Sequence, residues 1–240
     1  SQYATYRYFN NSVDLDLRYD TKNIRFHAGV SFDPQRTKMQ YTRPSQLDTL
    51  ITRSVFNVSP TLRFRYRMSK TNSIDIRYRG KAGQPSMTNL LDVVDNSDPL
   101  NISMGNPGLK PSWTNTLRAS YYGYNPARQA GIMAHLSFAH TTNSISTRVI
   151  YNDATGVRYS RPENINGSWD LDGTFIYNFS FGKNKQFSLS TFTDVEFRND
   201  VGFISRISSP ALAPALFQSL LRPAASIKAN PRASYYNSVF

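Results

Sequence analysis

Residues 62–79 read LRFRYRMSKTNSIDIRYR. Apolar and charged residues alternate strictly on either side of the polar segment 69–73. The charged residues in this pattern are Arg63, Arg65, Arg67, Asp75, Arg77 and Arg79. Because successive side chains of a β-strand point to opposite faces, a period of two predicts a hairpin with one apolar and one charged face.

The same alternation recurs along much of the chain. It is found in residues 13–19, 24–32, 113–121, 132–138, 145–151, 169–181 and 187–197. The parity of the apolar positions shifts near Asn143, which predicts a β-bulge there. The pattern as a whole predicts an all-β, antiparallel sheet of about eight to ten strands.

The lengths of the connections indicate what kind of sheet this is. Short turns are predicted at 20–23, 69–73, 125–129 and 182–186, and long loops at 33–61 and 81–112. Short turns on one side and long loops on the other are typical of an up-and-down transmembrane β-barrel, with the long loops extracellular. We therefore expect residues 1–203 to form part of such a barrel. A soluble antiparallel sheet with one solvated face is the alternative.

Residues 204–240 do not fit the strand pattern. This tail contains 209–223, SPALAPALFQSLLRP, which predicts a short helix or an irregular covering loop. The N-terminus lacks the basic and apolar segments of a signal peptide, so we expect a mature chain or a piece of a longer one.

Composition limits the remaining possibilities. The 240 residues carry a net charge of +12 and include no cysteine, which excludes disulfides, thiolate metal sites and thiol nucleophiles. No run of about 18 apolar residues occurs, so no transmembrane helix is predicted. The positive charge would suit a polyanion. Nucleic acid is not expected, because the aromatic residues of 62–79 face away from the arginines.

The charged face is expected to line the barrel lumen. A four-residue turn at 20–23 would set Arg18 opposite Arg25 and Asp16 opposite His27. A five-residue turn at 69–73 would set Arg67 opposite Asp75, Arg65 opposite Arg77, and Arg63 opposite Arg79. Opposed like charges destabilise a sheet, so this basic wall calls for an acidic partner. An acidic sector is expected where Asp172 falls opposite Glu196. The predicted wall residues are His27, Arg63, Arg65, Arg67, Arg77 and Arg79.

The segment 81–112 reads KAGQPSMTNLLDVVDNSDPLNISMGNPGLKPS. Its PS, DNSDPLN and GNPGLKP elements resemble the barrel region of TonB-dependent outer-membrane receptors of the Bacteroidetes type. The resemblance extends over about 60–203, through Asn125-Pro126 and the polar segments that follow Asn143 and Asn199.

The resemblance implies a fragment of a 22-stranded barrel in the outer membrane. Such a barrel is plugged by an N-terminal domain and takes up a bulky nutrient with energy from TonB. The implied partners are outer-membrane lipid, the rest of the receptor with its plug, the TonB complex through an N-terminal part, and a surface lipoprotein. The alternative function is a soluble or cell-surface all-β binding or adhesion module.

The long loop holds the candidate ligand-binding residues, which are Asp92, Asp95, Asn96, Asp98 and Asn101. Its carboxylates lack the spacing of a calcium loop. His27, His135 and His140 have no spacing typical of metal ligation or of a nucleophile–base pair. We therefore expect no catalytic residues, no metal site, no cofactor and no enzymatic activity.

Overall fold

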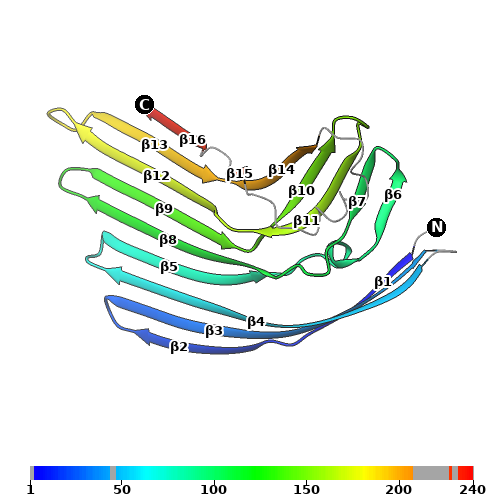
Figure 1. The fold of residues 1–240 in the computed structure, drawn as a ribbon. Helices are drawn as coiled ribbons and strands as arrows, with labels where there is room; N and C mark the ends of the chain where they lie inside the picture. The colour runs from blue at the N-terminus through cyan, green and yellow to red at the C-terminus, as the bar shows by residue number, and fades with distance from the viewer. Residues whose placement is uncertain (1–2, 44–46, 208–226, 229–231, 240) are drawn as a thin grey trace.

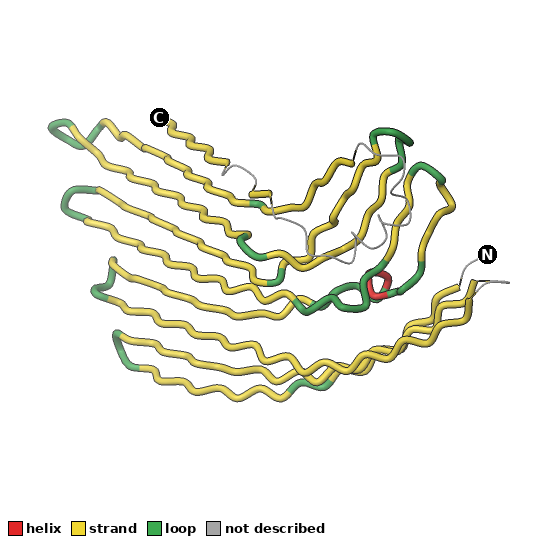
Figure 2. Tube along the Cα trace, viewed as in Figure 1, coloured by secondary structure: helices red, strands yellow, loops and turns green. Residues whose placement is uncertain are grey.

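The computed structural model describes residues 3–43, 47–207, 227–228 and 232–239. Nearly all of them lie in β-strands, and the one helical element in these ranges is the 3-10 helix η1 (Thr88–Leu90). The described residues contain no helix with the length and hydrophobicity needed to cross a bilayer. The strands gather into two sheets of unequal size (Figures 1 and 2).

The larger sheet, here called the wall, has ten strands that are antiparallel throughout. Its order is β1-β3-β4-β5-β8-β9-β12-β13-β16, with β2 also beside β3. The strands are β1 (Tyr3–Asn10), β2 (Val13–Asp20), β3 (Ile24–Arg43), β4 (Leu47–Arg67), β5 (Asn72–Gly83), β8 (Ser112–Asn125), β9 (Ala130–Thr142), β12 (Ser168–Phe181), β13 (Phe187–Asn199) and β16 (Arg232–Val239). The predicted antiparallel, partial barrel is confirmed.

The strand registers give the wall one apolar and one polar face. Directly paired residues share a face, so a row of partners can be followed from β2 to β13. One such row is Leu17, Ala28, Leu62, Tyr78, Leu117, Phe138, Leu171 and Phe197. Several of these side chains are exposed, Leu17 by 65%. An apolar surface this continuous suits lipid better than water.

Four short turns lie at one end of the wall. They join β2 to β3, β4 to β5, β8 to β9 and β12 to β13, on the left in Figure 1. At the other end the chain leaves the wall three times, after β5, β9 and β13. The three segments outside the wall are here called the first, second and third excursions. These departures correspond in part to the predicted long loop at 81–112.

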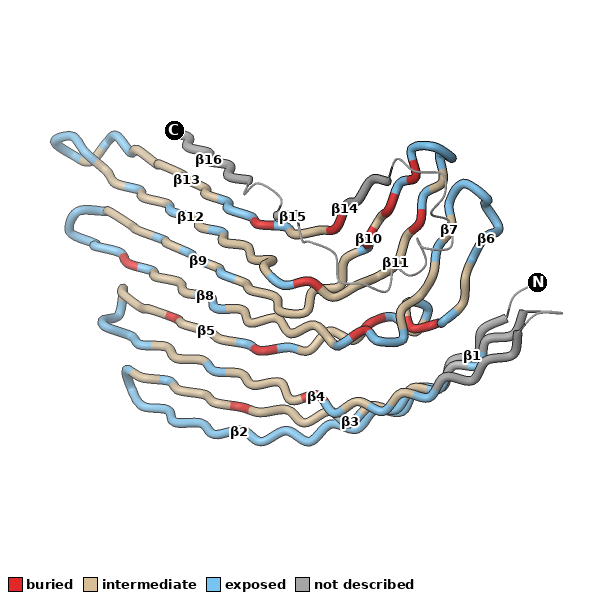
Figure 3. Tube along the Cα trace, viewed as in Figure 1, coloured by how far each residue is buried: buried red, intermediate tan, exposed pale blue. Residues whose placement is uncertain are grey.

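The three excursions together form the second sheet, here called the excursion sheet. Its order is β15-β14-β10-β11-β7-β6. The strands are β6 (Val94–Asp98), β7 (Asn101–Met104), β10 (Ser144–Asn152), β11 (Arg158–Ile165), β14 (Val201–Ile207) and β15 (Ile227–Lys228). Its buried centre is Ile150 and Tyr159, with Ile102 and Val157 packed against them. Figure 3 shows buried residues clustered in this sheet.

Two predictions about these segments are wrong, and a third is not tested. The expected long loop 33–61 is largely strand, because β3 and β4 pair continuously from Ile24 and Tyr66 out to Arg43 and Leu47. The tail is not irregular over Arg232–Val239, which pairs with β13 as β16. The segment 209–223 that suggested a helix lies outside the described residues.

The expected bulge near Asn143 is instead a corner between the two sheets. Asn143 has φ +51, and its N–H donates to Asn166 Oδ1 at 2.6 Å. The chain turns there from β9 of the wall into β10 of the excursion sheet. Asparagine adopts this left-handed conformation more readily than most residues, which explains the change of parity.

Candidate functional site

A basic band crosses the polar face of the wall. Following the register from β2 to β8, one row of partners is Arg18, His27, Arg63, Arg77 and Arg118. The neighbouring row places Arg25 beside Arg65. Like charges set directly opposite one another repel, so the band needs a counter-charge.

Asp75 on β5 supplies that counter-charge from within the band. Its carboxylate accepts hydrogen bonds from Arg65 Nε at 2.8 Å, Arg63 Nη2 at 2.9 Å and Arg77 Nε at 2.5 Å. The Asp75 side chain is 10% exposed, whereas the three arginines are 37–54% exposed. One buried carboxylate therefore organises three partly solvated guanidinium groups, with charge-assisted hydrogen bonds.

The band keeps an excess of positive charge. Within the described part of the chain, no ion pair involves Arg25, Arg79 or Arg118. A hollow of about 210 Å³ opens beside the band. It is lined by Arg18, Asp20, Arg25, Phe26, His27, Arg63 and Arg65. Such a site can hold a carboxylate or phosphate group of a partner.

The cross-strand partners predicted from the turns are wrong by two residues. Thr21 N–H donates to the Ile24 carbonyl at 2.7 Å, so the turn is tighter than expected. As a result Arg18 lies opposite His27 and not opposite Arg25. His27 Nε2 does contact Asp16, at 2.6 Å, although Asp16 is paired with Gly29 in the ladder.

The register of β4 and β5 also differs from the prediction by two residues, in the opposite direction. Arg65 lies opposite Asp75, and Arg63 lies opposite Arg77. Arg79 is paired with Thr61, and Arg67 lies next to the turn opposite Ser73. A shift of two residues leaves every side chain on its predicted face, so all six predicted wall residues share the polar face.

An acidic sector occupies the same face on β12 and β13. Asp172 lies directly opposite Glu196, as predicted from the sequence. Asp194 accepts a hydrogen bond from Thr174 Oγ1 at 2.7 Å. A single row of partners thus begins with Arg18 on β2 and ends with Asp172 on β12 and Glu196 on β13.

Hydrogen bonds of the GNPGLKP segment attach the first excursion, between β5 and β8, to the second, between β9 and β12. A Cβ at Gly105 would lie 2.0 Å from the Leu91 carbonyl oxygen, so the position accepts only glycine. Asn106 Nδ2 donates to the Pro162 carbonyl at 2.9 Å. Asn106 Oδ1 accepts from Arg161 Nη2 at 3.1 Å and from Gly108 N–H at 3.0 Å.

The next residues extend this attachment. Lys110 N–H donates to Asn164 Oδ1 at 2.7 Å, and Asn164 Nδ2 donates back to the Lys110 carbonyl at 2.9 Å. On the neighbouring strand, Arg148 forms a buried ion pair with Glu163 at 3.1 Å. The GNPGLKP motif therefore has a structural role, because it attaches the first excursion to the second.

The predicted ligand-binding residues lie in or beside the β6–β7 hairpin. Asp98 accepts hydrogen bonds from Asn101 Nδ2 at 2.7 Å and from Leu100 N–H at 2.9 Å. These bonds, the Asn101 bond foremost, hold the pKa of the Asp98 carboxyl below its ordinary value. Asp95 caps Ser97 N–H at 3.1 Å. Asp92 and Asn96 are exposed.

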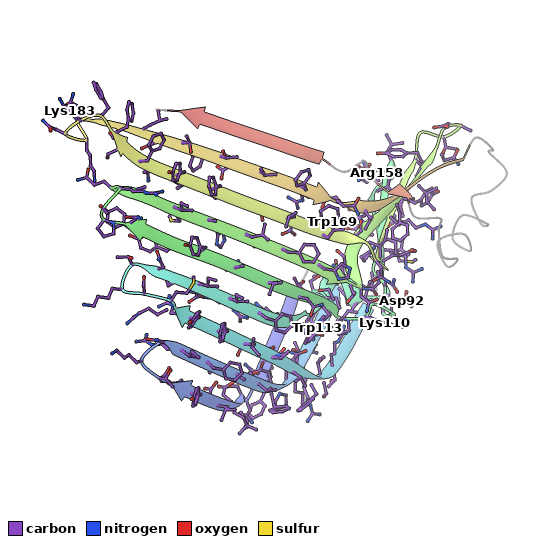
Figure 4. All side chains as sticks on the ribbon, turned by 90° about the vertical axis from the view of Figure 1, so that its left-hand side faces the viewer. Asp92, Lys110, Trp113, Arg158, Trp169 and Lys183 are labelled. Carbon is purple, nitrogen blue, oxygen red and sulfur yellow. The ribbon has the colours of Figure 1, made fainter. Side chains whose placement is uncertain are left out.

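Two of these five residues thus build the hairpin turn itself, and their role in ligand binding stays a prediction. Figure 4 places Asp92 at the excursion end of the molecule, near Lys110, and Lys183 at the opposite end. No cluster of three potential metal ligands occurs among the described residues.

Arg18, Arg25 and Arg118 also belong to the basic band, and the sequence-based set of wall residues omitted them. Each sits on the polar parity of a strand that the alternation identified. The signal was therefore present in the sequence, and for Arg118 the missing information was that its strand lies beside β5.

A sheet that is apolar across eight neighbouring strands on one face and charged on the other forms the wall of a transmembrane β-barrel. Comparison with known proteins agrees. The chain belongs to the outer membrane protein beta-barrel family, whose model matches residues 3–212. The protein is accordingly located in the outer membrane.

The other comparisons are more distant. No curated protein matches the chain. Among solved structures, the siderophore receptor PirA from Acinetobacter baumannii is similar, with 11% sequence identity and a TM-score of 0.43. The similarity covers 98% of this chain and 48% of the receptor, so the chain spans about half the receptor's length.

Proposed function

We propose that this chain is part of the barrel of a TonB-dependent receptor that binds a bulky nutrient and takes it up across the outer membrane. The observation that carries the proposal is the excursion sheet. Three separate departures from the wall combine into one folded surface at a single end of it. A surface of this kind suits capture of a large ligand better than a plain channel does.

The remaining receptor is part of the same proposal. Among the described strands, β1 and β2 form one edge of the wall and β16 forms the other. Unpaired backbone groups cost several kcal/mol each in hydrocarbon, so further strands are needed to close the barrel. We assign the excess charge of the basic band to contacts with an acidic surface of a plug domain. A TonB complex and a surface lipoprotein are the further proposed partners.

Uptake accounts for the polar face better than catalysis does. His135 Nδ1 lies 3.0 Å from Ser120 Oγ, which is the spacing of a nucleophile and a base. Yet no carboxylate in the described ranges binds the His135 ring, and the pair lies among the charged residues of the wall. The arrangement lacks the third group that would orient the base.

The test is nutrient uptake by cells that carry a defined deletion. Asp95 and Ser103 are cross-strand partners, so a Gly-Ser link can replace residues 96–99 at the tip and leave Ile102 and the pairing of β7 with β11 in place. We expect the deletion to abolish growth on whichever of a glycan, haem, siderophore or peptide source requires the intact protein. Shortening the exposed turn 153–156 is the matched control and should leave growth unchanged.

Two results would contradict the proposal. One is growth on all four sources that is indifferent to removal of the whole gene. The other is uptake that continues after the proton-motive force is collapsed with a protonophore. Intact mass spectrometry of the outer-membrane fraction provides an independent check, because a receptor must be far heavier than this 240-residue chain.

A further inference from the structure

The four short turns of the wall carry positive charge only. They comprise residues 21–23, 68–71, 126–129 and 182–186. Their charged residues are Lys22, Lys70, Arg128, Lys183 and Lys185, and none of the four turns contains Asp or Glu. The excursion end, in contrast, mixes both signs, with Asp92, Asp95, Asp98 and Asp153 beside Lys110 and Arg158. The turns therefore form a predominantly positive edge of the molecule, with the exposed Asp20 at the end of β2 adjacent to the first turn.

Aromatic side chains lie next to these turns on the apolar face. Phe181 and Phe187 flank the β12–β13 turn with their rings stacked at 5.5 Å, and they are 49% and 54% exposed. Tyr19 and Tyr66 end their strands in the same way and are also exposed. Aromatic belts of this kind mark the level of lipid headgroups. The cations of the turns thus lie just beyond the edge of the hydrocarbon.

A hollow of about 480 Å³ joins the two kinds of surface. Tyr121, Ile132 and Tyr177 of the apolar face line it, together with polar residues of the turns that include Arg128 and Asn125. A Cβ at Gly123 would lie 2.6 Å from Tyr121 Oη, so the Tyr121 ring lies over Gly123 with its hydroxyl toward the turn. Apolar walls below and a cation above fit an acyl chain and its phosphate.

Arg128 is available for such a ligand. Its backbone N–H donates to Asn125 Oδ1, whereas its guanidinium forms no ion pair within the described ranges. Lys185 is different, because its Nζ contacts the Ala127 carbonyl and so links two turns. Arg128, Lys22, Lys70 and Lys183 are the side chains free to meet a headgroup.

We propose that this hollow and the basic turns bind an anionic glycerophospholipid of the inner leaflet, with the phosphate on Arg128 and an acyl chain along Tyr121, Ile132 and Tyr177. The proposal depends on the outer-membrane location and not on nutrient uptake, so the two can fail separately. Each surface cation near an anionic membrane contributes about 1 kcal/mol, which corresponds to about a fivefold change in affinity.

The experiment measures lipid retained by the full-length protein in nanodiscs. The discs contain phosphatidylcholine alone, phosphatidylcholine with phosphatidylglycerol, or phosphatidylcholine with lipid A, and native mass spectrometry counts the bound lipids. We expect the protein to prefer phosphatidylglycerol, and Arg128→Gln to reduce that preference about fivefold. The variant Lys22→Gln/Lys70→Gln/Arg128→Gln/Lys183→Gln should abolish it. Lys110→Gln, at the opposite end, is the matched control and should change nothing.

Three outcomes would overturn the proposal. The first is equal retention of phosphatidylglycerol and phosphatidylcholine by the unaltered protein. The second is a preference that survives the fourfold variant, provided that circular dichroism shows the variant folded. The third is an Arg128-dependent preference for lipid A over phosphatidylglycerol, which would place the turns at the outer leaflet.

Discussion

At the scale of single residues, Asp75 is the position on which the polar face depends most. Its carboxylate is the shared acceptor for Arg63, Arg65 and Arg77. Removing it would leave three guanidinium groups close together without an anion. Because the arginines are partly solvated, the penalty should fall below that of a fully buried pair.

We expect Asp75→Asn to lower the free energy of unfolding by about 1–3 kcal/mol, since a neutral amide cannot offset three positive charges. Urea titration of the folded, detergent-solubilised protein would measure the change. The matched control is Asp172→Asn, which relieves repulsion with Glu196 and should leave stability equal or higher. Equal losses in both variants would contradict the role assigned to Asp75.

A second residue-scale prediction concerns Asn106. Its side chain makes three hydrogen bonds, to Pro162, Arg161 and Gly108. Asn106→Ala should therefore weaken attachment of the first excursion by about 2–3 kcal/mol. Hydrogen exchange in β6 and β7 would report this as faster local opening. Asn96→Ala, at an exposed position of β6, is the control. Exchange that accelerates equally in both variants would contradict the role assigned to Asn106.

At the scale of elements, alternation along β9 assigns each side chain to lipid or to the lumen. Leu136 belongs to the apolar face and is 49% exposed, whereas the next residue, Ser137, lies in the charged row. Spin labels at Leu136→Cys and Ser137→Cys can be compared without background, since the chain has no native cysteine. In lipid, oxygen should relax the first label more strongly, and a water-soluble nickel reagent the second. Identical accessibility would argue against a bilayer-spanning β9.

This alternation is also the part of the fold that sequence reasoning could predict. A bilayer on one face and charged groups on the other require a strict period of two. The strands of the wall could therefore be recognised from the sequence. Faces were assigned correctly for the same reason. Cross-strand partners were not, because they depend on one or two residues of turn length, as the Thr21 turn shows.

The segments beyond the apolar band were harder to predict. In residues 33–43 and 47–59 both faces can be solvated, so no period separates strand from loop, and β3 and β4 were cut short. The excursion sheet depends on contacts between segments more than fifty residues apart, such as Asn106 with Pro162. No local pattern encodes such contacts, and so the GNPGLKP signature could be recognised without its role being understood.

At the scale of the whole molecule, the apolar face should govern behaviour in solution. Exposed Leu15, Leu17 and Phe187, each more than half accessible, belong to a surface that has no reason to remain in water. We expect the refolded chain to be monodisperse in detergent and to aggregate when the detergent is removed. Size-exclusion chromatography with light scattering would show this. A monodisperse, detergent-free monomer would instead favour the soluble or cell-surface binding module.

The attachment of the β6–β7 hairpin has a consequence for the evolution of such a protein. Its attachment is made by Gly105, Asn106 and Lys110 and by the backbone of Leu100 and of β7 beside β11, whereas the Asp98 side chain at the tip bonds only to Leu100 and Asn101. Substitutions at the tip leave the attachment untouched. The surface that a phage or an antibody would meet can therefore diverge quickly, while the residues that fix its position stay constant.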